Sequence, residues 1–217
     1  MADDTQKGTF ADFDFASALE FLGLFPYEKW RIDASPVSAS DLLIGSLKRA
    51  ERQVTANTNE WEQRLFMELV FLEALEGRNI RMWQEKSIDA GDAPFRGKVD
   101  FAFTPYRASF RVPYVVLSEA KKDDFDKGWG QCLMAAKTTQ RLNEQENHRF
   151  DIYGIVSNGK VWEFGKYTTD NRFYKTGAYS LEQLDILLGV LGMIFAACDA
   201  REIQTPTPNP GINPTVK

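Results

Sequence analysis

Beyond residue 58 the spacing of hydrophobic and polar positions changes several times, and each change marks a predicted element. Asn59 is a suitable N-cap, with Glu62 completing the capping box, for a helix that runs to about Glu76 and is ended by Gly77. Three runs with the apolar and β-branched content of strands follow at residues 80–88, 97–103 and 112–120.

The second half of this region continues the same kind of pattern. Helical spacing extends from Lys127 to about Asn143, and two further strands are predicted at residues 151–157 and 160–167. Asn158-Gly159 between them is a strong hairpin turn signal, and a helix from Leu181 to Ala200 closes the region. The order helix, three strands, helix, two strands, helix predicts an α/β sandwich with a central mixed β-sheet flanked by helices.

Three parts of the chain differ in pattern. Residues 1–57 are predicted to form an N-terminal helical appendage, with a helix in residues 15–25 and a second one that Ser40 caps. Residues 58–204 form the α/β domain. Residues 205–217 belong to a proline-rich tail that is predicted to be disordered.

Composition narrows the class of protein. The 217 residues carry a formal net charge of -5, which counts against a sequence-independent coat on nucleic acid and requires any DNA contact to come from a local basic patch. Cys132 and Cys198 are far apart and form no C-x-x-C pair, so a structural zinc site or disulfide framework is not expected. We expect a cytoplasmic protein, since the acidic and polar start MADDTQKGTF does not have the pattern of a signal peptide.

The longest apolar run, residues 186–198, is short for a membrane span. We interpret it as a buried helix, with a membrane or dimer segment as the alternative. Gly189 and Gly192 within it permit close helix packing, either in the core or across a homodimer.

Candidate catalytic and metal-binding residues lie at or near the ends of two predicted strands. Asp100 is followed, further along the chain, by the triplet Glu119-Ala120-Lys121. Side chains alternate along a strand, so Glu119 and Lys121 share one face and converge. Mg²⁺ prefers hard oxygen ligands and often uses one or two carboxylates, which Asp100 and Glu119 can supply together with the Ala120 carbonyl. Lys121 is suited to orient or deprotonate a water and to neutralise a developing oxyanion.

Glu68 is the candidate acid of the first helix. At 100° per residue it falls within a predicted apolar stripe formed by Trp61, Leu65, Leu72 and Leu75. A carboxylate that faces a core needs a partner, so we expect Glu68 to help hold a metal-bound water. The alternative is a glutamate that reaches solvent or pairs with a structural arginine.

Together, Glu68, Asp100, Glu119-Ala120-Lys121 and Gln131 resemble the PD-(D/E)XK nuclease superfamily. The stretch GIVSNGKVWEF is similar to the hairpin that follows the catalytic helix in the N-terminal nuclease domains of type I restriction endonuclease subunits. The resemblance covers residues 59–167 and implies a restriction-endonuclease-like fold, dependence on Mg²⁺ or Mn²⁺, and DNA as substrate.

Gln131 matches a glutamine common in the resolvase-like and type I branches. Val99 stands where the family name has proline, and the sequence contains no helicase region. The resemblance therefore implies a stand-alone deoxyribonuclease or one that depends on a partner subunit.

Further residues are candidates for DNA contact. Lys122, Lys127, Lys137 and Arg141 predict a basic patch. The alternative, a solvated face balanced by Asp123, Asp124 and Asp126, is slightly favoured. Trp129, between two glycines, is a candidate for stacking on a base or else a core anchor. His148, the single histidine, is read as a loop residue, which excludes histidine-based nuclease chemistry.

Three hypotheses remain open from the sequence. The first is a metal-dependent DNA nuclease acting in restriction, repair or mobile-element defence. The second is a degenerate nuclease fold that binds DNA or a protein without cutting. The third is a structural subunit in which Glu119 and Lys121 form an internal salt bridge.

Overall fold

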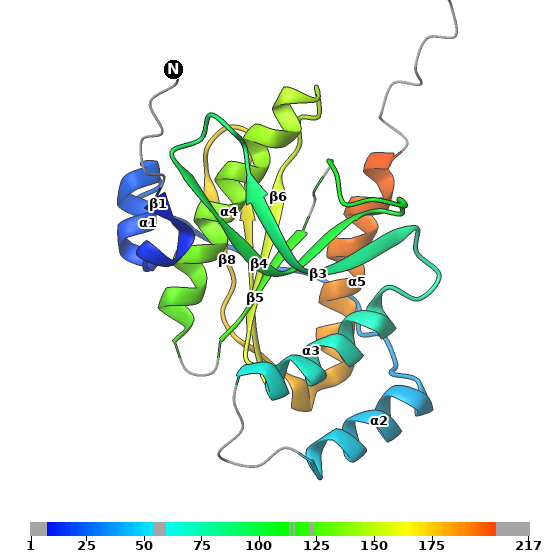
Figure 1. The fold of residues 1–217 in the computed structure, drawn as a ribbon. Coiled ribbons are helices and arrows are strands. Elements are labelled where there is room, and N and C mark those ends of the chain that lie inside the picture. Colours follow the sequence, from blue (N-terminus) through cyan, green and yellow to red (C-terminus); the bar gives the residue numbers. More distant parts are fainter. Residues whose placement is uncertain (1–7, 54–59, 113, 115, 122–123, 203–217) are drawn as a thin grey trace, which may run out of the picture.

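The computed structural model describes residues 8–53, 60–112, 114, 116–121 and 124–202. Its central part follows the predicted order of helix, three strands, helix, two strands and helix (Figure 1). These elements are α3 (Glu60–Ala74), β3 (Ile80–Asp89), β4 (Phe95–Pro105), β5 (Val116–Ala120), α4 (Phe125–Gln145), β6 (Ile152–Ser157), β7 (Val161–Tyr167) and α5 (Leu184–Glu202).

Short elements complete the described chain. They are β1 (Gly8–Thr9), α1 (Phe15–Leu22), β2 (Glu28–Lys29), α2 (Asp41–Glu51), β8 (Phe173–Lys175), β9 (Tyr179–Ser180) and two 3-10 turns at Phe10–Asp12 and Leu181–Gln183. Nine strands form one sheet in the order β1-β4-β5-β6-β7-β8-β2, with β3 paired to β4 and β9 to β7. The β5–β6 pair is parallel, whereas β3–β4, β4–β5 and β6–β7 are antiparallel, so the sheet is mixed as predicted.

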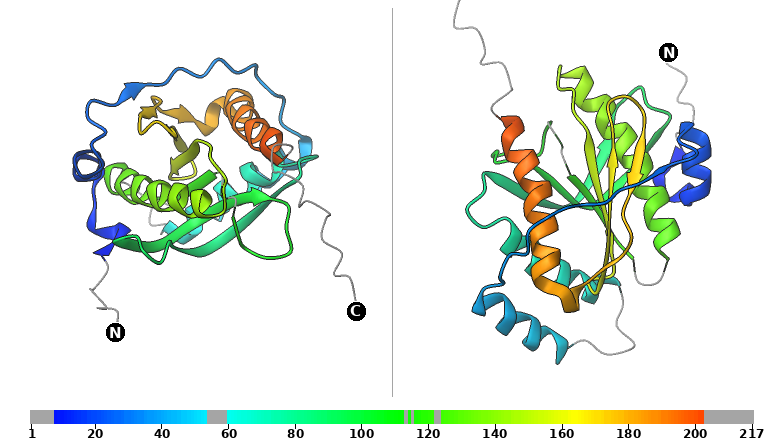
Figure 2. Two further views of the ribbon diagram at one scale, coloured as in Figure 1. Left: turned by 90° about the horizontal axis from the view of Figure 1, so that it is seen from above. Right: turned by 180° about the vertical axis from the view of Figure 1, so that it is seen from behind.

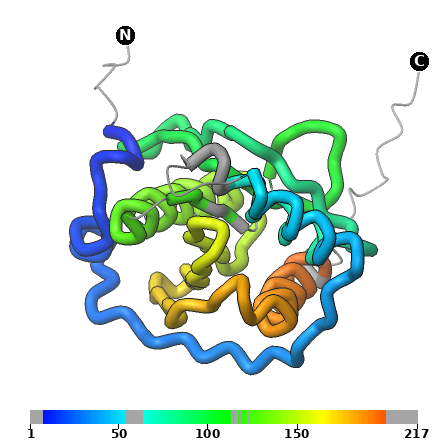
Figure 3. Tube along the Cα trace, turned by 90° about the horizontal axis from the view of Figure 1, so that it is seen from below, coloured from blue at the N-terminus to red at the C-terminus, as the bar shows by residue number. Residues whose placement is uncertain are grey.

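Helices cover the sheet on both sides and enclose two hydrophobic cores. One core joins α3 and α5 to the sheet, with Phe71, Phe103 and Phe195 in mutual ring contact. The other lies under α4 and α1 and is centred on Trp129 and Leu133. In Figure 3 the yellow strands β6 and β7 run between α4 on one side and α5 on the other.

The described part of the N-terminal region wraps around this sandwich (Figures 2 and 3). It supplies β1 beside β4 and β2 beside β8, and its helices α1 and α2 place Leu19 in one core and Leu43 in the other. Ser40 caps α2 as predicted, because its hydroxyl oxygen accepts from the Leu43 N–H at 3.1 Å. The region therefore contributes strands to the sheet and side chains to both cores, in addition to carrying two helices.

Helix α3 differs from the prediction in the face that it buries. Leu65 and Leu72 of the expected stripe are 40% and 59% exposed, while its member Leu75 is buried, as are Phe66, Val70 and Phe71. The assignment of that stripe was wrong because the helix is apolar around most of its circumference, so several stripes fit the sequence equally well. The expected N-cap Asn59 lies outside the described residues, as does the side chain of Trp61.

Helix α5 combines an apolar composition with a core position. Judged by length and composition alone, the segment Leu181–Asp199 is long and apolar enough to cross a membrane. Inside the protein, 44% of an 18-residue stretch of it is buried. Gly189 packs against the N-terminal region of the same chain, since a Cβ there would lie 2.2 Å from the Ser35 carbonyl oxygen. This close approach explains the glycine without a second subunit. The proline-rich tail lies outside the described residues.

Candidate active site

Asp100 lies where β4 and β5 separate. The pairing of these strands ends at Phe101 and Ser118. One residue further, the Asp100 side chain replaces the backbone as acceptor, and the Ala120 N–H donates to its Oδ2 at 2.7 Å. The other oxygen, Oδ1, accepts from Arg64. Burial raises the pKa of Asp100, while the Ala120 hydrogen bond and the charges of Arg64 and Lys121 act in the opposite direction.

Glu119 is the most deeply buried acid of this group, with 3% of its surface exposed. Its pKa is raised well above the ordinary value, first by burial and then by the negative charge of Asp100 and a hydrogen bond between the two side chains. The charges of Lys121 and Arg64 oppose this shift. Among the described residues its Oε1 has no hydrogen-bond partner. Asp100 and Glu119 therefore interact directly, and one Glu119 oxygen is left without a partner in the described part of the chain.

Lys121 directly follows β5 and is held by its backbone and its stem. Its N–H donates to the Ser157 carbonyl at 2.8 Å. The stem runs close to Gly128 in the first turn of α4, where an added Cβ would lie 2.9 Å from the Lys121 Cγ. The positive charge lowers the pKa of both Asp100 and Glu119. The structure thus brings this lysine and both acids together, as the triplet predicts.

Arg64 of α3 is a member of the site that sequence reasoning missed. Its two terminal nitrogens donate to Asp100 and to Glu85 of β3, and its side chain is 18% exposed. A signal was available, because Arg64 precedes Glu68 by four residues and therefore shares its helix face. That position alone did not reveal which strands the guanidinium would reach.

Glu85 marks an irregularity in β3. Its backbone has a φ of 51°, in the left-handed region that residues other than glycine rarely adopt. The neighbouring pairs Gln84–Phe101 and Lys86–Val99 place Glu85 level with Asp100 across the ladder. Such local strain is typical of functional sites, where surrounding contacts hold it in place.

Glu68 is half-buried on α3, and burial raises its pKa. The charge of Arg64 and a hydrogen bond with the Gln84 side chain act against this shift. Within the described contacts, Glu68 reaches the acid pair only through Arg64. The described contacts thus place Glu68 beside an arginine, as in the alternative, and its expected part in holding a metal-bound water stays a prediction.

Gln131 lies in α4, three residues after Gly128, so the two positions share one side of the helix. Cys132 beside it is buried, and the charge of Glu119 contributes to the raised pKa of its thiol. Gly128, three residues before Gln131, faces Lys121 and Val156. The Oε1 of Gln131 is buried without a partner among the described residues.

These oxygens fit a hard divalent cation. Among the described residues, Glu119 and Gln131 each have a buried oxygen without a hydrogen-bond partner, and such oxygens, like the Asp100 carboxylate, are donors that suit Mg²⁺ or Mn²⁺. Ala120, whose carbonyl is the expected third ligand, is 1% exposed between Glu119 and Lys121. No group of three or more histidine, cysteine, aspartate or glutamate side chains in the described ranges is arranged as a metal site.

Trp129 is a core residue and is not accessible to a nucleobase. It is 1% exposed, and its indole N–H donates to Glu163 Oε2 at 2.6 Å. The Lys175 ammonium lies 5.4 Å from the centre of the ring. The stacking interpretation was therefore wrong, and the core-anchor alternative is confirmed.

The predicted basic patch does not assemble as one surface beside the acids. Lys122 lies outside the described residues, and Lys127 is partly exposed in the first turn of α4. Lys137 is exposed, with its ammonium 5.5 Å from the centre of the Tyr167 ring. Arg141 forms an exposed ion pair with an aspartate of the β3–β4 connection at 2.5 Å.

Distance along the helix gives the reason. Lys137 and Arg141 follow Gly128 by nine and thirteen residues, which corresponds to about 14 and 20 Å of α-helix. The spacing predicted a shared face correctly, but that face begins beyond the turn that carries Gln131. Lys127 is the one described member of the patch that lies near this turn.

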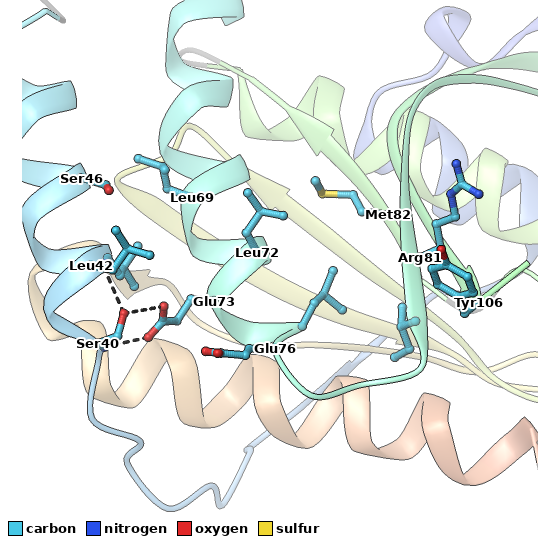
Figure 4. A pocket seen from close by; sticks show the side chains of 13 residues that line it. Ser40, Leu42, Ser46, Leu69, Leu72, Glu73, Glu76, Arg81, Met82 and Tyr106 are labelled. Atoms are coloured by element: carbon cyan, nitrogen blue, oxygen red, sulfur yellow. Dashed lines mark hydrogen bonds between the residues drawn. The ribbon is translucent and has the colours of Figure 1, made fainter.

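A separate groove of about 730 Å³ lies between α2, α3 and β3 (Figure 4). Leu42, Leu69, Leu72 and Met82 contribute apolar surface, and Ser40 joins the walls through its hydrogen bonds to Glu73. None of the acids of the candidate site lines it. The groove and the acid pair are therefore distinct features.

Comparison of the sequence with models of known protein families finds no match, and comparison with curated proteins finds none either.

Proposed function

We propose that this protein is a metal-dependent phosphodiester hydrolase that acts on DNA. The observation that supports it most directly is the meeting of Asp100, Glu119 and Lys121 at the point where β4 and β5 separate, with the pKa of each acid sensitive to the lysine. Phosphodiester hydrolysis needs positive charge beside an anionic group, and this site offers both ligands for a cation and a lysine.

The proposed roles follow from position. Asp100, Glu119 and the Ala120 carbonyl would hold Mg²⁺ or Mn²⁺, which when bound supplies charge neutralisation at the phosphate. The Lys121 side chain would orient the attacking water as an ammonium or take its proton as a neutral amine, and the ammonium would stabilise charge that develops on the phosphate oxygens. Gln131 would bind the same water through its amide, whose Oε1 is buried. Glu68 would act indirectly, through its interaction with Arg64.

We also propose that the mixed α/β sandwich is a restriction-endonuclease-like fold. The described elements support this assignment because a helix with an acid precedes adjacent strands that carry Asp100 and Glu119-Ala120-Lys121, and α4 follows with Gln131. DNA is the proposed substrate because the motif resembles nucleases of that class. A partner subunit or a homodimer would supply further DNA contacts.

Cleavage assays with matched variants test this function. Purified protein is incubated with duplex, single-stranded and branched DNA in Mg²⁺ or Mn²⁺, beside the variants Asp100→Asn and Lys121→Met. Each should lose cleavage by about 100-fold or more, as expected for groups that act together in the transition state. The controls Asp92→Asn and Lys48→Met change exposed residues of the same types elsewhere and should cleave normally. Unchanged cleavage by Asp100→Asn would refute the assignment.

A second candidate is a nuclease-like binding module without catalysis. It is favoured by one observation, the Arg64 guanidinium that already neutralises Asp100. Such a module would bind DNA equally well with and without divalent ions and would leave it intact. Binding that is independent of metal, together with the absence of cleavage across the substrate panel, would support this candidate over the hydrolase.

A further inference from the structure

Arg64 interacts with four acids around the candidate site. It donates directly to two of them, Asp100 and Glu85, which come from different strands. Its charge also lowers the pKa of Glu68 and of Glu119. One guanidinium therefore acts as the counter-ion of the carboxylates on α3, β3, β4 and β5 that surround the site.

Asp100 has donors on both of its oxygens. Oδ2 accepts from the Ala120 N–H at 2.7 Å, and Oδ1 accepts from Arg64. The Ala120 donor belongs to the backbone and stays fixed when ions bind. A cation that approaches this carboxylate must therefore share Oδ1 with a positively charged group or displace it, and two cations beside one carboxylate repel each other.

Arg64 has a second anchor that permits displacement. Its Nη1 donates to Glu85, whose side chain is 52% exposed, whereas the Asp100 side chain is 14% exposed. The guanidinium thus spans from the buried acid to the rim of the site. It can leave Asp100 and retain its pair with Glu85 by rotating about side-chain bonds.

We propose that Arg64 is the resident counter-cation of this site and that a divalent cation binds by displacing its guanidinium from Asp100. The inference rests on the proposed function, since it takes Asp100 as a ligand. Arg64 is a positioning residue in this scheme: it keeps the acids together before the metal arrives and sets how tightly the metal is held. Its removal should therefore weaken the metal-free fold and strengthen metal binding.

The test compares Mn²⁺ binding by calorimetric titration and unfolding temperature with and without Mn²⁺, using Arg64→Gln and the parent protein. Arg64→Gln should unfold at a lower temperature without metal and should bind Mn²⁺ about tenfold more tightly, because a positive charge that competes for Asp100 Oδ1 is removed. Arg78→Gln is the matched control, because it removes another partly buried ion pair, to Asp199 at 3.2 Å. It should leave Mn²⁺ affinity unchanged.

Each outcome has a separate meaning. Equal or weaker Mn²⁺ binding by Arg64→Gln, with binding by the parent that is lost in Asp100→Asn, overturns the role of Arg64 and leaves the hydrolase proposal standing. Absence of Asp100-dependent Mn²⁺ binding in both proteins overturns both proposals. If Arg64→Gln does not fold, Arg64→Lys retains one charge without the planar fork and should bind Mn²⁺ severalfold more tightly; unchanged affinity in that variant overturns the inference.

Discussion

Gly128 offers a direct test of how closely α4 approaches the lysine of the candidate site. A Cβ added there would lie 2.7 Å from Val156 Cγ1 and 2.9 Å from Lys121 Cγ. Real side chains do not pack at such distances, so Gly128→Ala must move α4, Val156 or the lysine stem. Val156 is fully buried and β-branched, which leaves it little freedom to adjust.

The expected magnitude is the balance of two effects. Overpacking of a close-packed interior typically costs about 1–3 kcal/mol of unfolding free energy. Replacing glycine by alanine within a helix returns about 0.5–1 kcal/mol. The net prediction is that Gly128→Ala lowers the free energy of unfolding by about 1 kcal/mol and displaces Lys121 from the acids.

Urea unfolding followed by circular dichroism measures this change, with Gly45→Ala as the control. Gly45 lies within α2 and has open space around its missing Cβ, so its replacement should raise the free energy of unfolding by about 0.5–1 kcal/mol. A double-mutant cycle with Lys121→Ala, which removes the Cγ, should show coupling of about 0.5 kcal/mol or more between the two positions.

One result would refute the reasoning. If Gly128→Ala stabilises the protein as much as Gly45→Ala does, α4 does not pass this close to Lys121 and Val156. The proposed role of Gln131 would then lose support as well, since it depends on the approach of the same part of α4.

Three further predictions concern other parts of the molecule. His148 is the single histidine, and burial together with the charge of Arg107 lowers its pKa below 6.5. Its stabilising contribution should therefore be present above pH 6.5 and decline as the pH falls through that value. An NMR titration of its one imidazole signal and urea unfolding at several pH values can check this. Trp129→Phe removes the hydrogen bond to Glu163 and should lower the free energy of unfolding by about 2 kcal/mol, measured by urea unfolding. Arg141→Gln breaks an exposed ion pair and should leave the urea midpoint unchanged.

The elements between α3 and β7 could be predicted because their signals are local. A continuous apolar run identifies β6, and apolar residues at Trp162 and Phe164 on either side of a glutamate identify β7. Asn158-Gly159 between them forms the turn, with Gly159 at a φ of 81°. Capping by Ser40 depends on its own neighbours in the same way. Each of these features is decided within a few residues, so the sequence contains the information directly.

The path of the N-terminal region could not be predicted in this way. Nothing near Glu28 indicates that β2 pairs with β8, or near Gly8 that β1 pairs with β4. The face of α3 was misassigned for a related reason, because a helix that is apolar on many sides is oriented by the surfaces available to it. Tertiary contacts decide these outcomes.

In the candidate site, too, some features follow from local sequence and others depend on tertiary contacts. The convergence of Glu119 and Lys121 follows from strand periodicity, whereas the participation of Arg64 depends on how α3 crosses β3 and β4. The left-handed conformation of Glu85 has no signal in its residue type. Charge partners supplied by a separate element are thus the part of such a site that needs coordinates.

The wrapped N-terminal region has a consequence for the order of assembly. During synthesis, Glu28 leaves the ribosome long before Tyr174, its partner in the β2–β8 pair. Pairings between such remote positions are slow to form because a large loop must close first. The N-terminal region is therefore synthesised early but joins the sheet late. Until β2 pairs with β8, the unpaired edge of β8 is open to association with other nascent chains.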